Sequence, residues 1–204
     1  MDTLQEKQIY TRKKILLASR RLFFGVGFSK ITMDEIAEEL NMSKRTIYQL
    51  FKSKDFLLKA VIKDFFQEFQ NKLNQITTNQ NTQGLGTLKM FIGLIQEQLA
   101  IFNIYAFKDI SKSNPEAWQK IKNLREKTIN KKLEELIFKA KKEGAIRQDI
   151  DINILVLLIL NTIQTVINPE TIAQLPYSTD EVVNMMSKFI ISGLIKDDSD
   201  LMIN

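Results

Sequence analysis

The sequence predicts an all-α protein, and three observations favour that class. Only seven Gly and three Pro occur in 204 residues, so the chain has few of the turn residues on which sandwiches and barrels depend. Apolar residues recur at helical spacing from end to end, and no strand alternation persists. Capping signals separate these stretches. We expect about nine helices in two domains, residues 1–53 and 54–204.

The first two helices are predicted in the N-terminal third. Apolar residues share one helical face between about Thr11 and Val26, and Gly25 and Gly27 favour the end of this helix. The second helix opens at Thr32-Met33-Asp34-Glu35, a capping box in which the Thr hydroxyl accepts a bond from the amide three residues on. Its apolar face continues to Leu40.

A short third helix, about 43–51, follows the turn Asn41-Met42-Ser43. Asn tolerates a left-handed turn better than any other residue except Gly, and Ser43 is a favourable N-cap. Ser53 then starts a fourth helix, whose apolar residues continue to Phe69. The inner face of the third helix is expected to carry Ile47, Leu50 and Phe51.

The middle of the chain holds the one stretch that resembles a linker. Residues 71–86 are polar, include two Gly and lack a sustained apolar face, so we expect them to end the fourth helix and form a loop. A fifth helix is expected at about 87–102 and a short one near 104–110.

The last three helices have clear start and stop signals. Asn114-Pro115-Glu116 predicts the start of a helix that runs to Glu143, where Gly144 stops it. Asp151 caps an apolar helix to about Ile167, which Asn168-Pro169 ends. Ser178-Thr179-Asp180-Glu181 is a second capping box and opens a helix to about Ile195.

The composition excludes several kinds of chemistry. With no Cys and no His, the chain has no disulfide, thiol nucleophile, Ser-His-Asp triad, imidazole base or ordinary zinc site. We therefore expect no enzyme, no metal and no cofactor, although Lys, Tyr or carboxylate catalysis stays open in principle. The polar N-terminus shows no signal peptide, and the longest apolar run, 154–160, is far short of the about 20 residues of a membrane span. We expect a cytoplasmic protein.

The positive charge is concentrated in the first third of the chain. Residues 1–60 hold 12 basic and 7 acidic side chains, whereas residues 61–204 hold 17 of each. A basic segment joined to a neutral remainder favours a module that binds a polyanion, although a solvated surface that happens to be basic gives the same count.

The two helices at 32–40 and 43–51 form a helix-turn-helix arrangement. The second helix of this motif can lie in the major groove of DNA, with its N-terminal side chains on base edges. Here those side chains are polar or basic, while the apolar ones point the other way. We therefore expect double-stranded DNA as a partner, with an all-helical protein-interaction module as the alternative.

Residues 11–62 resemble the N-terminal domain of the tetracycline-repressor (TetR) family. The resemblance is carried by a first helix ending F-x-x-x-G-F, then T-x-x-x-I-A, S-x-x-T-I-Y-x-x-F and S-K-x-x-L-L. It implies an N-terminal three-helix DNA-binding domain, a C-terminal helical domain for ligand binding and dimerisation, and a regulator that is usually a repressor. A small effector would release such a regulator from its operator.

The resemblance also implies roles for single residues. Thr32, Tyr48 and Lys54 would bind phosphates, and Arg45 would grip the O6/N7 pair of a guanine. The full expected set of DNA contacts is Thr32, Ser43, Lys44, Arg45, Thr46, Tyr48, Gln49 and Lys54.

Two positions depart from the family pattern. Gln49-Leu50 stands where the family often has an aromatic residue and His, so a phosphate contact is lost and Gln49 is expected to read adenine instead. Asn41 stands where Gly is usual, and both residues accept the turn geometry.

The family resemblance further implies an effector pocket between the long helices. No charge interrupts the apolar residues there, which favours a small hydrophobic effector, although aromatic residues at helical spacing are often plain core. Tyr105 and Trp118 stand out because each has a polar group that a buried site must satisfy. The expected pocket residues are Phe65, Phe69, Phe91, Leu94, Ile95, Phe102, Tyr105, Trp118 and Ile159.

The last two helices, about 152–167 and 180–195, carry more apolar residues than a one-sided surface helix needs. The resemblance implies a homodimer in which these two helices of each copy form a four-helix bundle. A larger monomeric core is the alternative.

Overall fold

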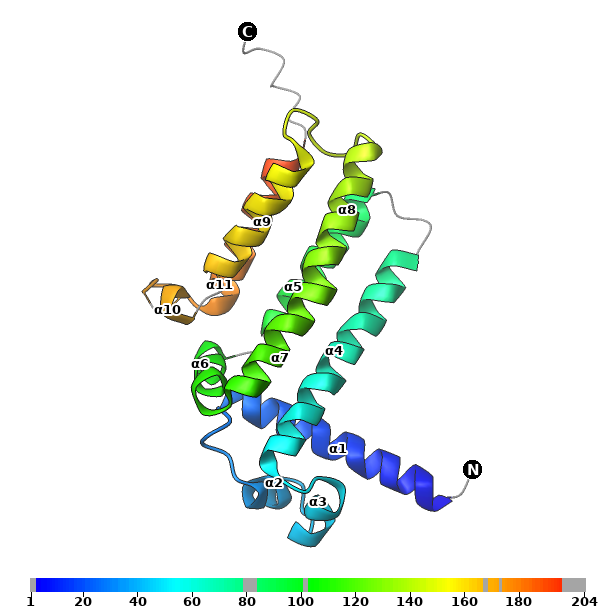
Figure 1. The fold of residues 1–204 in the computed structure, drawn as a ribbon, viewed down its shortest axis with the longest axis vertical. Coiled ribbons are helices and arrows are strands. Elements are labelled where there is room, and N and C mark those ends of the chain that lie inside the picture. Colours follow the sequence, from blue (N-terminus) through cyan, green and yellow to red (C-terminus); the bar gives the residue numbers. More distant parts are fainter. Residues whose placement is uncertain (1–2, 79–83, 101–102, 167–168, 173, 196–204) are drawn as a thin grey trace. The chain divides into compact units, whose positions relative to one another are not determined.

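The computed structural model describes residues 3–78, 84–100, 103–166, 169–172 and 174–195, which form helices joined by turns (Figure 1). The all-α prediction is confirmed, since these residues hold no strand. The helices are α1 (Thr3–Gly25), α2 (Met33–Glu39), α3 (Lys44–Leu50), α4 (Lys54–Thr78), α5 (Gly84–Ala100), α6 (Ile104–Ser113), α7 (Pro115–Arg125), the π-helical turn η1 (Glu126–Asn130), α8 (Lys131–Lys142), α9 (Ile152–Val166), α10 (Pro169–Ile172) and α11 (Thr179–Leu194).

The predicted start and stop signals act as expected. Thr32 and Ser178 both form complete capping boxes, and Asn41 adopts a left-handed conformation with φ of 50°. Gly144, with φ of 68°, ends the continuous helical run from Pro115 to Lys142. Asp151 caps α9 by accepting a bond from the Asn153 amide at 2.8 Å.

Two predicted boundaries are wrong. α4 continues through residues 71–78, and α5 already begins at Gly84, so the polar stretch 71–86 is largely helical. The helix holds because Leu73 is buried and the hydroxyls of Thr77 and Thr78 donate to backbone carbonyls one turn back. Polarity there marks a solvated helix face rather than a loop.

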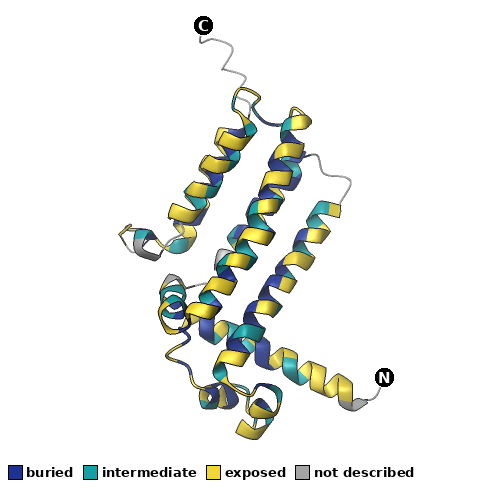
Figure 2. Ribbon diagram, in the orientation of Figure 1, coloured by how far each residue is buried: buried dark blue, intermediate teal, exposed yellow. Residues whose placement is uncertain are grey.

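α1 begins at Thr3, about two turns before the apolar pattern starts. Residues 5–10 are exposed, as Figure 2 shows, so hydrophobic periodicity gives no signal for them. Local contacts stabilise these turns instead: the Thr11 hydroxyl donates to the Lys7 carbonyl at 2.8 Å, and the Lys14 ammonium lies 4.8 Å from the Tyr10 ring centroid.

The chain divides into two compact units, each with its own core. Unit 1 comprises residues 1–69 and 101–123, and unit 2 comprises residues 70–100 and 124–204. In unit 1, Phe24 and Phe65 stack edge-on at 5.7 Å, and so do Phe23 and Phe28 at 5.3 Å. In unit 2, α5 packs on α8 and α11, and α9 packs on α8, α10 and α11.

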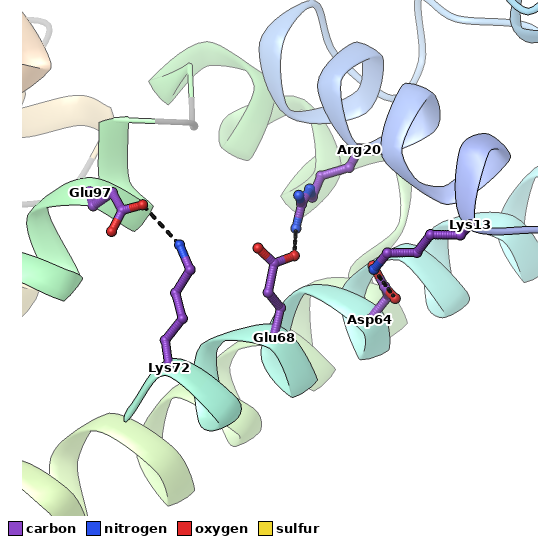
Figure 3. A network of polar contacts seen from close by, with 6 residues as sticks. All are labelled: Lys13, Arg20, Asp64, Glu68, Lys72 and Glu97. Atoms are coloured by element: carbon purple, nitrogen blue, oxygen red, sulfur yellow. Dashed lines mark hydrogen bonds and ion pairs between the residues drawn. The ribbon is translucent and has the colours of Figure 1, made fainter. Parts of the chain in front are cut away.

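Three charged residues of α4, Asp64, Glu68 and Lys72, lie four residues apart, and each takes part in an ion pair (Figure 3). In unit 1, Asp64 pairs with Lys13 at 3.0 Å and Glu68 pairs with Arg20 at 2.8 Å. In unit 2, Lys72 pairs with Glu97 of α5 at 2.8 Å. Part of the basic excess of the N-terminal third is therefore already neutralised by α4.

Candidate nucleic-acid interface

The capping box at Thr32 fixes the start of α2. The Thr32 hydroxyl accepts a bond from the Glu35 amide at 3.1 Å, and the Glu35 carboxylate accepts from the Thr32 amide at 2.6 Å. These bonds hold the pKa of Glu35 below its ordinary value. They also leave Thr32 exposed at the first turn of the helix, where a free amide end attracts anions.

The turn between α2 and α3 is held by backbone bonds. The Met42 amide donates to the Ala37 carbonyl at 2.9 Å, which the left-handed Asn41 makes possible. Ser43 then caps α3 by accepting from the Thr46 amide at 3.1 Å, and its hydroxyl lies 2.8 Å from that of Thr46. The sequence therefore builds α3 from its own turn chemistry.

α3 is anchored on one side and open on the other. Ile47 is fully buried, and so is Phe51 just after the helix, where the Arg12 guanidinium lies 4.5 Å from its ring centroid. Leu50 is half-buried. The opposite side carries Arg45, Tyr48 and Gln49, all exposed. A buried anchor with a polar outer face is the form that a helix needs to enter a groove.

Lys44 and Arg45 differ in their surroundings. The Lys44 ammonium donates to the Asp34 carboxylate of α2 at 2.5 Å, and this bond raises the pKa of Lys44. Within the described part of the chain, Arg45 has no ion-pair partner. Arg45 is therefore ready to bind an acceptor, whereas Lys44 must first exchange Asp34 for it.

Lys54 begins α4 next to the turn that carries Ser53. Its ammonium lies 4.4 Å from the centroid of the Phe28 ring, and burial lowers the pKa of Lys54. Lys54 is half-buried and its ammonium lies over the Phe28 ring, so that a substitution there affects this contact as well as the charge.

An acidic residue of α6 supports the loop before α2. The Asp109 carboxylate accepts from the Ser29 amide at 2.7 Å and from the Ser29 hydroxyl at 2.5 Å. Gly27 has φ of 125°, and a Cβ there would meet Asp109 at 3.1 Å, so the loop needs Gly at this point. Within unit 1, the path from α1 to Thr32 is thus fixed by α6.

Two basic residues next to the motif were missed by the sequence reasoning. Lys30 precedes the capping box and Lys52 lies between α3 and α4; both are exposed and, among the described residues, neither has an ion-pair partner. By contrast, Arg21 pairs with Glu39 and Lys59 pairs with Glu116. The charge count had already indicated an excess here, but only the structure separates free from paired cations.

The predicted pocket residues fall into both units. Phe65 and Phe69 are buried in unit 1, where Trp118 is half-buried and stacks on Phe107 at 5.7 Å. Tyr105 is 65% exposed. In unit 2, Phe91, Leu94 and Ile95 lie on one buried face of α5, and Ile159 is buried on α9. Phe102 lies outside the described residues.

Unit 2 contains polar groups that the sequence reasoning did not single out. Gln98 is buried on the same face of α5 as Phe91, Leu94 and Ile95. Thr128 is buried within the π-helical turn η1. A groove of about 520 Å³ lies between the end of α4 and α5, lined by Lys72, Gln75, Ile76, Met90, Leu94 and Glu97.

The outer faces of α9 and α11 carry exposed large apolar side chains. On α9, Ile154, Leu157 and Leu158 are exposed at three- and four-residue spacing, while Leu155 and Ile159 on its other side are buried. On α11, Met185 and Phe189 are exposed four residues apart, and Phe189 is the more exposed at 74%.

Known proteins resemble this chain both in its N-terminal part and along its length. Residues 15–61 match the family model described as bacterial regulatory proteins, tetR family. The uncharacterised HTH-type transcriptional regulator YvaF of Bacillus subtilis (strain 168) is 26% identical over 193 residues, which cover 91% of this chain and 96% of YvaF. The HTH-type transcriptional regulator UidR of Escherichia coli (strain K12) is 37% identical over 62 residues, which cover 30% of this chain and 32% of UidR.

Solved structures share the fold. A TetR family regulator from Agrobacterium tumefaciens superposes with a TM-score of 0.72 at 12% identity, covering 93% of this chain and all of that one. FadR from Bacillus subtilis in complex with stearoyl-CoA superposes with a TM-score of 0.63 at 20% identity, covering 89% of this chain and 98% of FadR. A putative regulator from Saccharomonospora viridis in complex with choline superposes with a TM-score of 0.68 at 19% identity, covering 91% of this chain and 98% of that one.

No described helix is long and apolar enough to cross a membrane. The helix-turn-helix geometry of α2 and α3 agrees with the family model over the same residues and with relatives that are transcriptional regulators. Residues 15–61 thus match the DNA-binding domain of the tetR family of bacterial regulatory proteins, and the chain, like the relatives that it matches, is a DNA-binding transcriptional regulator rather than an enzyme.

Proposed function

We propose that this regulator represses transcription as a homodimer bound to a palindromic operator and that a small, mainly hydrophobic effector releases it. The observation that carries the proposal is the construction of α3, in which the buried Ile47 anchors a helix whose outer face offers Arg45, Tyr48 and Gln49. Each half of the operator would receive one such helix.

The proposed DNA contacts divide into two kinds. Arg45 and Gln49 would read base edges, Arg on guanine and Gln on adenine. Thr32, Ser43, Thr46, Tyr48 and Lys54 would bind phosphates or cap the helices, and Lys44 would join them after leaving Asp34. Lys30 and Lys52 extend the phosphate-binding set, since both are exposed cations that flank the motif.

The exposed faces of α9 and α11 support the homodimer. Side chains such as Leu157 and Phe189 are large, apolar and exposed in the single chain. Burying them against the same face of a second copy would form an isologous interface, with each helix meeting its counterpart across a twofold axis.

The effector is proposed to bind among the apolar residues of the helices beyond the DNA-binding motif. The buried face of α5 supports this, because Phe91, Leu94 and Ile95 offer a mostly apolar surface beside a groove. FadR in complex with stearoyl-CoA and the S. viridis regulator in complex with choline are similar folds that hold small molecules, which supports an effector for this chain as well.

Selection from a random DNA library with the full chain tests the function. The proposal expects enrichment of an inverted repeat whose half-sites lie about 34–36 Å apart, one turn of the double helix. Recovery of sequences without twofold symmetry would contradict the dimeric operator. If the chain retains no DNA at low salt, the proposed function is wrong and the alternative, an all-helical protein-interaction module, replaces it.

A further inference from the structure

Gln98 is an unusual residue in the core of unit 2. It is 5% exposed, and its side-chain amide nitrogen has no hydrogen-bond partner in the part of the chain that the structure describes. Buried polar groups in proteins are nearly always paired, because an unpaired donor loses its bonds to water and gains nothing in return. A Met or Leu would fill the same space without this cost.

The neighbours of Gln98 on α5 are apolar. Phe91, Leu94 and Ile95 precede it by seven, four and three residues, which places them on the same helical face, and all three are buried. Gln98 therefore places an unpaired hydrogen-bond donor at the end of a mostly apolar surface, which is the pattern of a ligand site with an orienting polar group.

The π-helical turn lies at the same level of unit 2. Gly84 fits against Ala140 so closely that an added Cβ would come within 2.9 Å of the Ala140 Cα, and α5 packs along α8 in the opposite direction (Figure 1). Gln98 lies about 14 residues after Gly84 on α5, and the start of η1 lies about 14 residues before Ala140. Since both helices rise about 1.5 Å per residue and run in opposite directions, Gln98 lies level with the start of η1. Such π turns are frequent at functional sites.

A groove lies between the end of α4 and α5, and two of its lining residues, Leu94 and Glu97, are close to Gln98 along α5. Its volume of about 520 Å³ lies within the usual range for small-molecule sites of about 300–1,000 Å³. Leu94 lines the groove and lies one helical turn before Gln98 on the same face. The ion pair between Lys72 and Glu97 lies among the lining residues (Figure 3).

We propose that this groove and Gln98 form the effector site, and that the effector is an apolar molecule with one oxygen acceptor that takes a hydrogen bond from the Gln98 amide. The inference rests on the proposed effector-responsive function and adds the chemistry of the ligand. A hydrocarbon would leave the Gln98 donor unpaired, whereas a ketone of the same shape pairs it.

The first test needs no ligand. Gln98→Met keeps the length of the side chain and removes the unpaired amide, so it is expected to raise the Tm of the free full-length protein by a few degrees. Ser19→Ala is the matched control, because Ser19 is fully buried in unit 1 and its hydroxyl also has no partner in the described chain. Its Tm should rise as well. A lower Tm for Gln98→Met would overturn the inference, since the amide would then be paired in solution.

The second test uses a matched pair of probes, 1-tetralone and tetralin, which differ by one carbonyl. Isothermal titration of the full chain without DNA should show 1-tetralone binding about three to ten times more tightly than tetralin, the effect of one neutral hydrogen bond. Gln98→Met should bind the two probes equally, and Ser19→Ala should keep the wild-type ratio.

Equal affinities in the wild type, no binding of 1-tetralone, or a ratio that Gln98→Met leaves unchanged would each overturn the inference. Because this assay contains no operator, its result is separate from the DNA-binding function. A chain that binds 1-tetralone through Gln98 but no DNA would contradict the proposed function alone.

Discussion

α3 and α9 are both helices with one buried and one exposed face, yet their exposed faces differ in kind. α3 buries Ile47 and presents Arg45, Tyr48 and Gln49 to solvent. α9 buries Leu155 and Ile159 and presents Ile154, Leu157 and Leu158. The polar face suits a hydrated, negatively charged partner, whereas an exposed apolar face is typical of a site where another apolar surface binds.

The two faces separate the two proposed partners, DNA and a second copy of the chain, by chemistry. Binding through the face of α3 depends on charge, so it should weaken with salt and with the loss of single cations. Binding through α9 and α11 depends on buried apolar area, so it should resist salt and fail when a charge is placed in it.

Phe189→Glu should have the largest effect. Phe189 is 74% exposed on α11, and burying a Phe contributes about 1.5–3 kcal/mol, counted twice in a twofold interface. We expect dimer dissociation to rise at least about 100-fold, with a monomer in sedimentation velocity at micromolar concentration. Tyr105→Glu is the control, since Tyr105 is also a large exposed aromatic residue, on α6 in unit 1, and its substitution should leave the dimer unchanged. A stable Phe189→Glu dimer would remove α11 from the interface.

Arg45→Ala should relax sequence preference on DNA. A bidentate contact between Arg and guanine discriminates by about 1–3 kcal/mol, and Arg45 is exposed and has no ion-pair partner among the described residues. Affinity for the selected operator should therefore fall much more than affinity for a scrambled site. Lys54→Met removes the ammonium that lies over Phe28 but keeps an unbranched side chain, and it should weaken binding to both sites about equally. Anisotropy titrations with both DNAs check the division, and identical profiles for the two variants would refute it.

The two capping boxes allow a sharper comparison between the units. Thr32→Ala and Ser178→Ala each remove one cap, and each should lower the free energy of unfolding by about 0.5–2 kcal/mol in urea titrations. Only Thr32→Ala should also weaken operator binding, because Thr32 lies at the start of the motif. An equal loss of DNA affinity in Ser178→Ala would show that the loss reflects stability and not contact.

Acid should weaken the fold slightly through Asp149. Two bonds from the Arg147 guanidinium lower the pKa of Asp149 from 3.8 to about 2. Because the folded pKa is depressed, the contribution to stability is present above the unfolded value and is lost as pH falls from about 4 to about 2. Asp149→Asn should reduce the slope of Tm with pH in this window, and the reduction should be small because the pair is exposed. No change in slope would mean that the pair is broken in solution.

The N-terminal motif could be read from the sequence because its signals are local. Thr32, Asn41 and Ser43 each act through bonds to amides within a few residues, so residue type and spacing suffice to place α2 and α3. The same holds for Ser178 and Gly144. Such signals need no knowledge of the distant chain.

The wrong helix boundaries lie where residues distant in the sequence determine the local structure. Residues 71–78 stay helical because Leu73 is buried, and Gly84 starts α5 because Glu143 accepts its amide at 2.5 Å. Neither partner is visible in a local window. The pairing of Lys44 with Asp34 and the burial of Gln98 likewise depend on tertiary packing, so the sequence pattern did not single out either of them.

Operator binding against salt tests the central claim most directly. If each copy in a dimer neutralises about four phosphates, log K should fall against log salt with a slope near −0.9 per phosphate, or about −7 for the dimer. Anisotropy with the selected inverted repeat between about 50 and 200 mM NaCl covers the steep range. The account predicts this slope in the wild type and a slope smaller by about one per copy in Lys54→Met. Binding that hardly changes over this range would contradict it.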